Sequence, residues 1–282
     1  VFTDGQGLAA ETMQDITREM NYSESTFLLP PEAGGDFKVR IFTPAKEIPF
    51  AGHPIVGSSY VIAAEGLKHL GDASGLTLET GVGPIRVEIA VKEGKPGRTT
   101  MTQPLPRVTA VLGGKQVESL AEALGIHSSE IARTELPVQS MFNGIPMLVV
   151  PVGSLETIRA LRVEFGKLVT LAEEIGVDTV LVFTTQTVNP ESTVHCRVFG
   201  PGAGVIEDAA TGSANGPLGF YLVQHKLVKA EAVTRIISEQ GFEMKRPSTI
   251  FVDVEVQDAT GSITDVKVGG DVVITGRGEI VL

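Results

Sequence analysis

The chain has 282 residues, more than the ~100–150 residues of a typical single domain, which predicts two domains. Hydrophobic residues make up 42% and charged residues 20% of the sequence, a balance that supports a sizeable core and excludes a disordered chain. The formal net charge is −11. An acidic surface repels phosphate groups, so we expect neither nucleic acid nor a membrane surface as a partner.

Glycine (32 residues) and proline (16 residues) separate short apolar runs along the chain, which indicates many turns. Apolar residues at intervals of three and four predict helices, and short alternating or β-rich runs predict strands. In chain order, the expected elements are a helix over 10–20, strands over 26–29 and 37–42, a helix over 55–65, a strand over 85–89, a helix over 117–124, a strand over 148–150, a helix over 155–161, a strand over 179–183, a helix over 218–225 and a strand over 250–254.

One sequence pattern occurs twice. Residues 40–44 read Arg-Ile-Phe-Thr-Pro, and residues 197–201 read Arg-Val-Phe-Gly-Pro. Each copy is followed by a turn of small residues and then by an apolar helix. This repetition predicts two similar halves with a cleft between them. The proline-rich stretch 103–107 is the expected crossing point, because clustered prolines disfavour the continuation of a helix or a strand.

The turns after the two copies are candidate ligand sites. The N–H groups at a helix start have no partner within the helix, and they bind anions well. If the halves face each other, the turns at 50–54 and 208–213 could converge on one small carboxylate-bearing substrate. The alternative is that Asp208, Thr211 and Ser213 are ordinary N-cap residues.

No motif indicates a cofactor or a metal. The glycines of 200–204 lack the G-x-G-x-x-G spacing of a dinucleotide site, and the five histidines form no paired ligand motif. Cys196 is the single cysteine, which excludes an internal disulfide framework and multi-thiolate metal sites. Its place beside a predicted strand favours a buried, inert thiol. We expect the cytoplasm as the compartment, without a secretory signal.

Three titratable residues admit two interpretations each. Glu24 lies between a predicted helix and strand, where a carboxylate is usually solvent-facing; if the cleft wall desolvates it, its pKa rises toward neutrality and it can shuttle protons. His53 lies in a Gly/Pro-bounded turn at a helix start, and a hydrogen-bonded structural role is the alternative. Glu47 is a second acidic candidate, for which a surface turn is the simpler interpretation.

Residues 20–27, 40–54, 207–214 and 276–282 resemble the PhzF family of phenazine-biosynthesis-like isomerases. The resemblance implies an α+β, diaminopimelate-epimerase-like fold. In this fold two similar halves each wrap a curved mixed sheet around a central helix, and the active site lies in the cleft between them. The C-terminal strand returns to the first half, so the expected domains are 1–107 completed by 268–282, and 108–267.

The resemblance further implies a cofactor-independent isomerase that moves a proton on a small carboxylated cyclic substrate, such as trans-2,3-dihydro-3-hydroxyanthranilate, and that works as a homodimer. Glu24 matches the proton-shuttling carboxylate of the family. His53, Asp208 and Ser213 match supporting residues of the pocket. We add that the backbone of Gly212 and Ser213 holds the substrate carboxylate, with Thr211 and Gly52 beside the substrate in the two turns.

Two alternatives, one excluded mechanism and one departure from the family pattern accompany this prediction. The chain could be an isomerase or epimerase of an unrelated small amino or hydroxy acid, or a non-catalytic binding protein on the same scaffold. A two-thiol racemase is excluded, because neither turn contains a cysteine. Members of the family normally begin with a strand and a Gly-Asn-Pro turn before the segment that matches 1–4, so one strand is unaccounted for. If that strand is absent from the protein, the first sheet has an open edge; if the sequence is trimmed, nothing functional follows.

Overall fold

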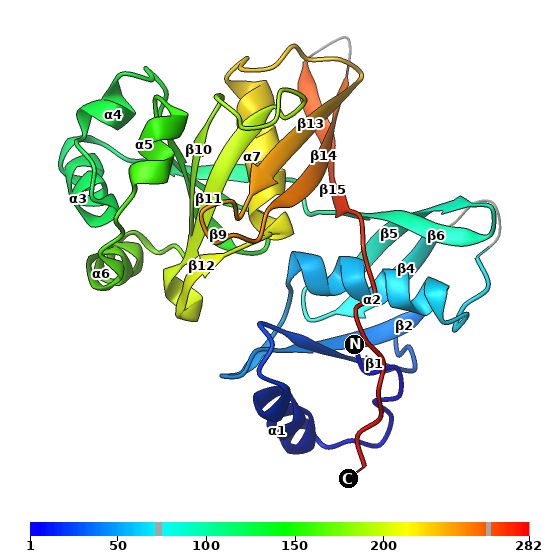
Figure 1. The fold of residues 1–282 in the computed structure, drawn as a ribbon. Coiled ribbons are helices and arrows are strands. Elements are labelled where there is room, and N and C mark those ends of the chain that lie inside the picture. The colour runs from blue at the N-terminus through cyan, green and yellow to red at the C-terminus, as the bar shows by residue number, and fades with distance from the viewer. Residues whose placement is uncertain (71–74, 258–260, 282) are drawn as a thin grey trace. The chain divides into compact units, whose positions relative to one another are not determined.

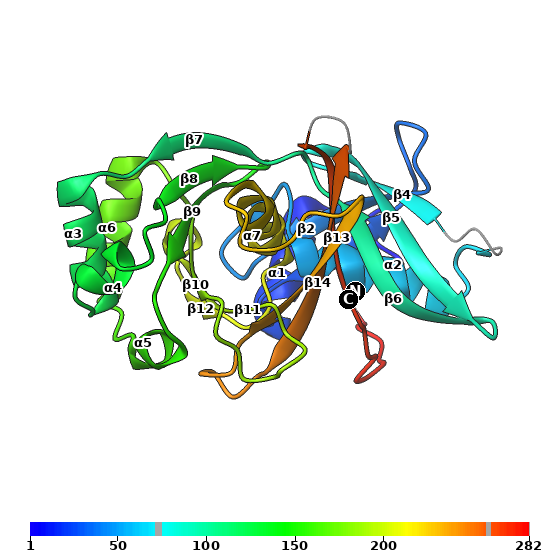
Figure 2. The ribbon, with the colours of Figure 1, turned by 90° about the horizontal axis from the view of Figure 1, so that it is seen from above.

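The computed structural model describes residues 1–70, 75–257 and 261–281 (Figures 1 and 2). The chain folds into two compact units. The N-terminal unit comprises Val1–Thr102 and Gly269–Leu282, and the C-terminal unit comprises Gln103–Val268. Each unit is built around its own mixed sheet.

The N-terminal unit contains two helices and six strands in its described part. They are α1 (Ala10–Met20), β1 (Ser25–Leu29), β2 (Phe37–Phe42), β3 (Glu47–Ile48), α2 (Gly52–Ala64), β4 (Gly75–Thr80), β5 (Gly83–Lys92) and β6 (Lys95–Thr102). The sheet has the order β1-β2-β4-β5-β6, with β3 paired to β2. β2 and β4 are parallel, and the other pairs are antiparallel.

Neighbouring residues of β1 face opposite sides of this sheet, and each side packs against one helix. Thr26 hydrogen-bonds Ser58 of α2 at 2.8 Å, whereas Phe27 packs with Met13 of α1 and with Phe42. This alternation is the two-residue period of a strand. The central helix α2 also packs against β4, β5 and β6 (Figure 1). It is apolar on nearly all sides, as expected of a helix enclosed by a sheet.

The outer edge of β1 is not open as expected. Phe2 N–H donates to Thr26 O at 2.7 Å, and Leu28 N–H donates to Phe2 O at 2.9 Å. Gly5 N–H donates to Leu28 O at 2.9 Å. Residues 2–5 therefore satisfy this edge, and the Phe2 ring stacks on Phe27 with centroids 4.6 Å apart.

The C-terminal segment returns to the N-terminal unit as expected, because Gly269–Leu282 belongs to that unit. The last strand, β15, ends at Gly270, and residues 271–281 contain no strand. Gly276 and Gly278 disfavour an extended ladder in this stretch. The segment is instead attached by an ion pair between Arg277 and Glu65 at 2.8 Å.

The C-terminal unit contains nine strands in its described part, together with short and long helices. They are β7 (Arg107–Val111), α3 (Gly114–Leu124), α4 (Ser129–Ala132), β8 (Gln139–Phe142), β9 (Pro146–Pro151), α5 (Leu155–Ala160), α6 (Phe165–Ile175), β10 (Thr179–Thr184), β11 (Val194–Gly200), η1 (Pro201–Ala203), β12 (Val205–Asp208), α7 (Gly212–Gln224), β13 (Val233–Gln240), β14 (Ser248–Gln257) and β15 (Ser262–Gly270). The strand order is β15-β14-β13-β11-β10-β9-β8-β7, with β12 paired to β11.

The sheet of the C-terminal unit also separates two helical layers. Val180 and Val182 of β10 belong to an apolar cluster with α3, α5 and α6. Phe183 faces the other side, where its ring meets Tyr221 of α7 edge to face at 5.5 Å. The helix α7 packs against β9, β13 and β14 (Figure 2). It therefore occupies in this unit the place that α2 occupies in the other.

In the described part of the chain, the sequence predicts five of the seven α-helices but only six of the fifteen strands. The predicted elements are α1, α2, α3, α5, α7, β1, β2, β5, β9, β10 and β14. The helix over 10–20 and the strand over 37–42 have the predicted bounds. α2 and α7 begin at Gly52 and Gly212, earlier than the predicted 55 and 218, because the small residues of each turn already form the first helical turn. The amphipathic helix α6 is missed by the prediction.

A buried charged cluster stabilises the C-terminal unit. His195 of β11 is fully buried, with Nδ1 2.8 Å from Glu239 and Nε2 3.1 Å from Glu243. Burial opposes a charged imidazole, but the hydrogen bonds with Glu243 and Glu239 raise the pKa of His195 above its usual 6.5. Burial also opposes the charged carboxylates, but hydrogen bonds, including those with His195, lower the pKa of both glutamates below 4.5.

His195→Gln tests this cluster through its pH dependence. The loss in free energy of unfolding should be greatest, ~3–5 kcal/mol, at pH values between the usual 4.5 of glutamate and 6.5 of histidine. Above that window the wild-type imidazole loses its proton, and below it the carboxylates gain theirs, so the difference shrinks on both sides. Urea unfolding at a series of pH values measures this difference. An equal loss at every pH would contradict the charged state.

Candidate active site

Both central helices follow a short hairpin closed by an arginine–glutamate pair. Arg40 of β2 donates from Nε and Nη2 to the two carboxylate oxygens of Glu47 in β3, each at 2.7 Å. Arg197 of β11 makes the same two bonds to Glu207 of β12, each at 2.8 Å. The two guanidinium groups also lie over Phe42 and Phe199, at 5.1 and 5.3 Å from the ring centroids. The repeated sequence pattern thus corresponds to a repeated structural feature, a hairpin closed by an arginine–glutamate pair.

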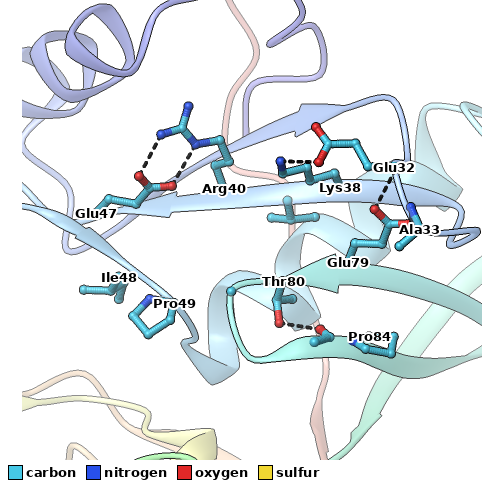
Figure 3. A pocket seen from close by; sticks show the side chains of 13 residues that line it. Glu32, Ala33, Lys38, Arg40, Glu47, Ile48, Pro49, Glu79, Thr80 and Pro84 are labelled. Carbon is cyan, nitrogen blue, oxygen red and sulfur yellow. Dashed lines mark hydrogen bonds and ion pairs between the residues drawn. The ribbon is translucent and has the colours of Figure 1, made fainter.

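This contact gives Glu47 a structural role. The hydrogen bond from Arg40 is the main cause that lowers the pKa of Glu47. Its carboxylate is held in a bidentate pair, as Figure 3 shows. Glu47, the second acidic candidate of the sequence, therefore fixes the hairpin that precedes α2.

In the N-terminal unit, the structure brings Glu24 and His53 together. His53 Nε2 lies 2.7 Å from Glu24 Oε2, and the side chains are 42% and 16% exposed. His53 is the second residue of α2, directly after the buried Gly52. Two residues that the resemblance assigns to the pocket are therefore neighbours within one unit.

Local structure explains the position of Glu24. Asn21 ends α1 in the left-handed conformation, with φ 50° and ψ 34°, and its N–H donates to Thr17 O. The chain then turns through three residues before β1 begins at Ser25. The bond between Thr26 and Ser58 joins the start of β1 to α2. Glu24 is thus held beside the first turn of α2.

The pKa of Glu24 is not raised as the desolvation hypothesis expects. Burial does disfavour the carboxylate, but the hydrogen bond and the charge of His53, with a further hydrogen bond from Ser23, lower the pKa below 4.5. The sequence hypothesis considered burial without this partner. Glu24 is therefore ionised at neutral pH, the state in which a carboxylate can accept a proton.

In the C-terminal unit, Asp208 and Thr211 are linked through a buried glutamine. Thr211 Oγ1 donates to Asp208 Oδ2 at 2.6 Å. Gln240 Nε2 donates to Thr211 Oγ1 at 2.9 Å and to Asp208 O at 2.7 Å, while Gln240 Oε1 accepts from Thr211 N–H at 3.1 Å. The threonine hydroxyl thus accepts from Gln240 and donates to Asp208.

These bonds differ from ordinary N-capping. Thr211 is the N-cap residue of α7, but its side chain makes no capping bond. Among the described residues, no protein acceptor receives a hydrogen bond from the N–H of Gly212 or Ser213. Two backbone donors at the positive end of α7 are therefore free for an anion. The sequence does not indicate Gln240, because it lies 29 residues from Thr211 and no local pattern connects them.

Other titratable groups do not belong to the candidate site. Cys196 is buried, and burial raises the pKa of its thiol to about 12, which confirms the inert thiol. No group of three or more His, Cys, Asp or Glu side chains in the described ranges is arranged to hold a metal ion. None of the described helices has the length and hydropathy of a membrane span.

A separate pocket of the N-terminal unit is lined by paired charges (Figure 3). Lys38 contacts Glu32 at 2.7 Å, next to the pair of Arg40 and Glu47. The carboxylate of Glu79 accepts backbone N–H groups of the loop at 32–35, at 2.7 to 2.8 Å. Of the candidate residues of the sequence, the pocket contains only Glu47, and its charged groups support the surrounding loops.

Comparisons with known proteins identify the family. A family model described as PhzC-PhzF, phenazine biosynthesis-like protein, matches residues 1–278. A trans-2,3-dihydro-3-hydroxyanthranilate isomerase of Pseudomonas fluorescens is 37% identical over 286 residues, covering 100% of this chain and 92% of the relative. Further relatives from other bacteria are named uncharacterised isomerases.

Solved structures agree with the expected α+β fold. The structure of a PhzF-family phenazine biosynthesis protein from Bacillus anthracis is similar with a TM-score of 0.83 and 27% identity, covering 96% of this chain and 91% of that one. A protein of Pseudomonas aeruginosa described as a predicted epimerase has a TM-score of 0.80 and 28% identity, with 100% and 92% covered. These findings confirm the fold class and the isomerase class predicted from the motifs. The chain belongs to the PhzC-PhzF family of phenazine biosynthesis-like proteins.

Proposed function

We propose that the protein is a cofactor-independent isomerase that moves a proton on a small carboxylated cyclic substrate. The contact of 2.7 Å between Glu24 and His53 carries this proposal, because it keeps a mostly buried carboxylate charged. The first candidate substrate is trans-2,3-dihydro-3-hydroxyanthranilate, on which the relative from Pseudomonas fluorescens is named to act.

Glu24 acts first as a base and then as an acid. Its carboxylate removes a proton from a ring carbon, and the electron pair of the broken C–H bond moves into the ring system. The protonated Glu24 then returns this proton to another carbon on the same face, and the resulting enol tautomerises to a ketone. No atom is gained or lost, so no co-reactant is needed. Such general acid–base catalysis contributes ~10²–10⁴-fold to the rate.

The substrate carboxylate binds at the start of α7. The free N–H groups of Gly212 and Ser213 supply two donors, and Asp208 and Thr211 line the same turn. Gly52 allows close approach at the start of α2. The two sets lie in different units. Positioning and carboxylate binding then supply the part of the rate that proton transfer does not.

Glu24→Gln tests the proton carrier. With trans-2,3-dihydro-3-hydroxyanthranilate in D₂O, NMR should show ketone formation with deuterium incorporation by the wild type. The variant should lose ~10²–10⁴-fold in kcat, because an amide cannot take up the proton. Glu19→Gln, an exposed substitution in the same unit, is the matched control and should keep wild-type turnover.

Each other outcome has a distinct meaning. Undiminished turnover by Glu24→Gln would refute the assignment of Glu24 while leaving the isomerase in place. No turnover by the wild type would reject this substrate. A screen of cyclic amino and hydroxy acids would then separate an unrelated isomerase from a binding protein.

His53→Gln tests the charge state of the base. Because His53 opposes the effect of burial, its loss should raise the pKa of Glu24, and the acidic limb of kcat/KM should move to higher pH. Carbon-13 NMR of labelled glutamate carboxyl groups measures the pKa directly. Glu47, whose pKa depends on Arg40, is an internal control that should not move. A Glu24 pKa that stays the same or falls would contradict the role of His53.

We further propose that the enzyme works as a homodimer in the cytoplasm. The family resemblance supports the dimer, and a single buried cysteine suits a reducing compartment. Sedimentation equilibrium should therefore give twice the mass of one chain, whereas a concentration-independent single-chain mass would reject the dimer.

A further inference from the structure

Three consecutive carbonyl groups at the start of α7 accept hydrogen bonds from side-chain amides. Asn215 Nδ2 donates to Thr211 O at 3.0 Å. Gln103 Nε2 donates to Gly212 O at 2.9 Å, and Asn143 Nδ2 donates to Ser213 O at 2.8 Å. We call Gln103, Asn143 and Asn215 the amide cradle. All three belong to the C-terminal unit.

The cradle is buried and internally connected. Gln103, Asn143 and Asn215 are 3%, 1% and 0% exposed. Asn143 Nδ2 also donates to Gln103 Oε1 at 3.0 Å. Gly216 makes room for this contact, because a Cβ atom there would lie 2.0 Å from Gln103 Oε1. Buried amides are unfavourable unless they are hydrogen-bonded, so their convergence on one helical turn needs an explanation.

Pro217 explains one of the three bonds. In a regular helix the N–H of residue 217 would donate to the carbonyl of Ser213, four residues earlier. Proline has no N–H, so this carbonyl lacks its helical partner. Asn143 supplies the missing donor. Asn143 Oδ1 has no hydrogen-bond partner among the described residues. The orientation of this side chain is therefore set by the bond that its Nδ2 donates to the helix.

The other two bonds act on the free backbone donors. The carbonyl of Gly212 and the N–H of Ser213 belong to one planar peptide group, as do the carbonyl of Thr211 and the N–H of Gly212. A hydrogen bond accepted by the carbonyl polarises the peptide and strengthens its N–H as a donor. Gln103 therefore acts on the N–H of Ser213, and Asn215 acts on the N–H of Gly212.

We propose that the amide cradle consists of positioning residues that fix and strengthen the backbone donors for the substrate carboxylate. This inference rests on the proposed binding of a carboxylate at the start of α7. The cradle residues act through the peptide groups and are not themselves catalytic. They make the site selective for a planar anion in a defined orientation, rather than for negative charge in general.

Gln103→Met and Asn143→Leu test the proposal, since both remove donors at similar volume. KM should rise about tenfold in Gln103→Met, with kcat changed less, because the substrate carboxylate stays charged throughout the reaction and its binding is mostly uniform. Gln139→Met is the matched control: this buried glutamine of the same unit contacts His225 instead. Its thermal stability should fall while its KM stays at the wild-type value.

Pro217→Ala provides a rescue that distinguishes positioning from general destabilisation. Alanine restores a helical N–H for the carbonyl of Ser213. In the Asn143→Leu background, KM should therefore return toward the wild-type value, whereas in the Gln103→Met background it should remain raised. Equal KM values in Gln103→Met, Asn143→Leu and the wild type, with only the melting temperatures lowered, would overturn the proposal.

Benzoate binding separates this inference from the proposed reaction. In ¹H–¹⁵N NMR, benzoate should move the amide signals of Gly212 and Ser213, with an affinity about tenfold weaker in Gln103→Met. This result supports the cradle even if no turnover is found. If benzoate leaves the Ser213 signal unmoved, or binds both proteins equally, the inference is wrong whatever the activity of the enzyme.

Discussion

Two bidentate arginine–glutamate pairs close the hairpins that precede the two central helices, and so fix where each helix begins. The pair of Arg197 and Glu207 is the more buried, with side chains 10% and 14% exposed, so the loss of one partner would leave a largely desolvated charge. Arg40 and Glu47 are more exposed, and their contact depends more on geometry than on burial. Each pair closes a hairpin before a helix with a functional first turn. The position of Glu24 relative to α2, and of Asp208 relative to α7, depends on these hairpins.

The motifs of this chain predict its family and fold, because they combine residues that the fold requires with residues that the chemistry requires. Arg40 and Arg197 mark the repeated hairpins, and Glu24 and His53 are recognised by their motifs and lie in contact. The pKa of Glu24, in contrast, could not be predicted from these motifs. Its pKa results from burial and His53 acting in opposite directions, and the sequence does not contain their relative sizes.

The amides of the C-terminal unit show a second limit. Gln103, Asn143 and Gln240 come from separate segments, so their convergence on one turn depends on the tertiary fold. Pro217 is the local signal that was available, because a proline inside a helix requires another donor for a carbonyl. Residues 2–5 illustrate the same dependence, because they bond to β1 from a separate part of the chain.

Pro217 has a further consequence for how the C-terminal unit acquires its function. Because Pro217 has no N–H, the carbonyl of Ser213 needs a hydrogen-bond donor from outside the helix. The donors from Asn143 and Gln103 arrive only after their own segments have packed against α7. The hydrogen bonds of the helix start are therefore complete only when those segments are in place. They cannot be transferred with the α7 sequence alone, because an isolated α7 peptide would lack the donors of Asn143 and Gln103.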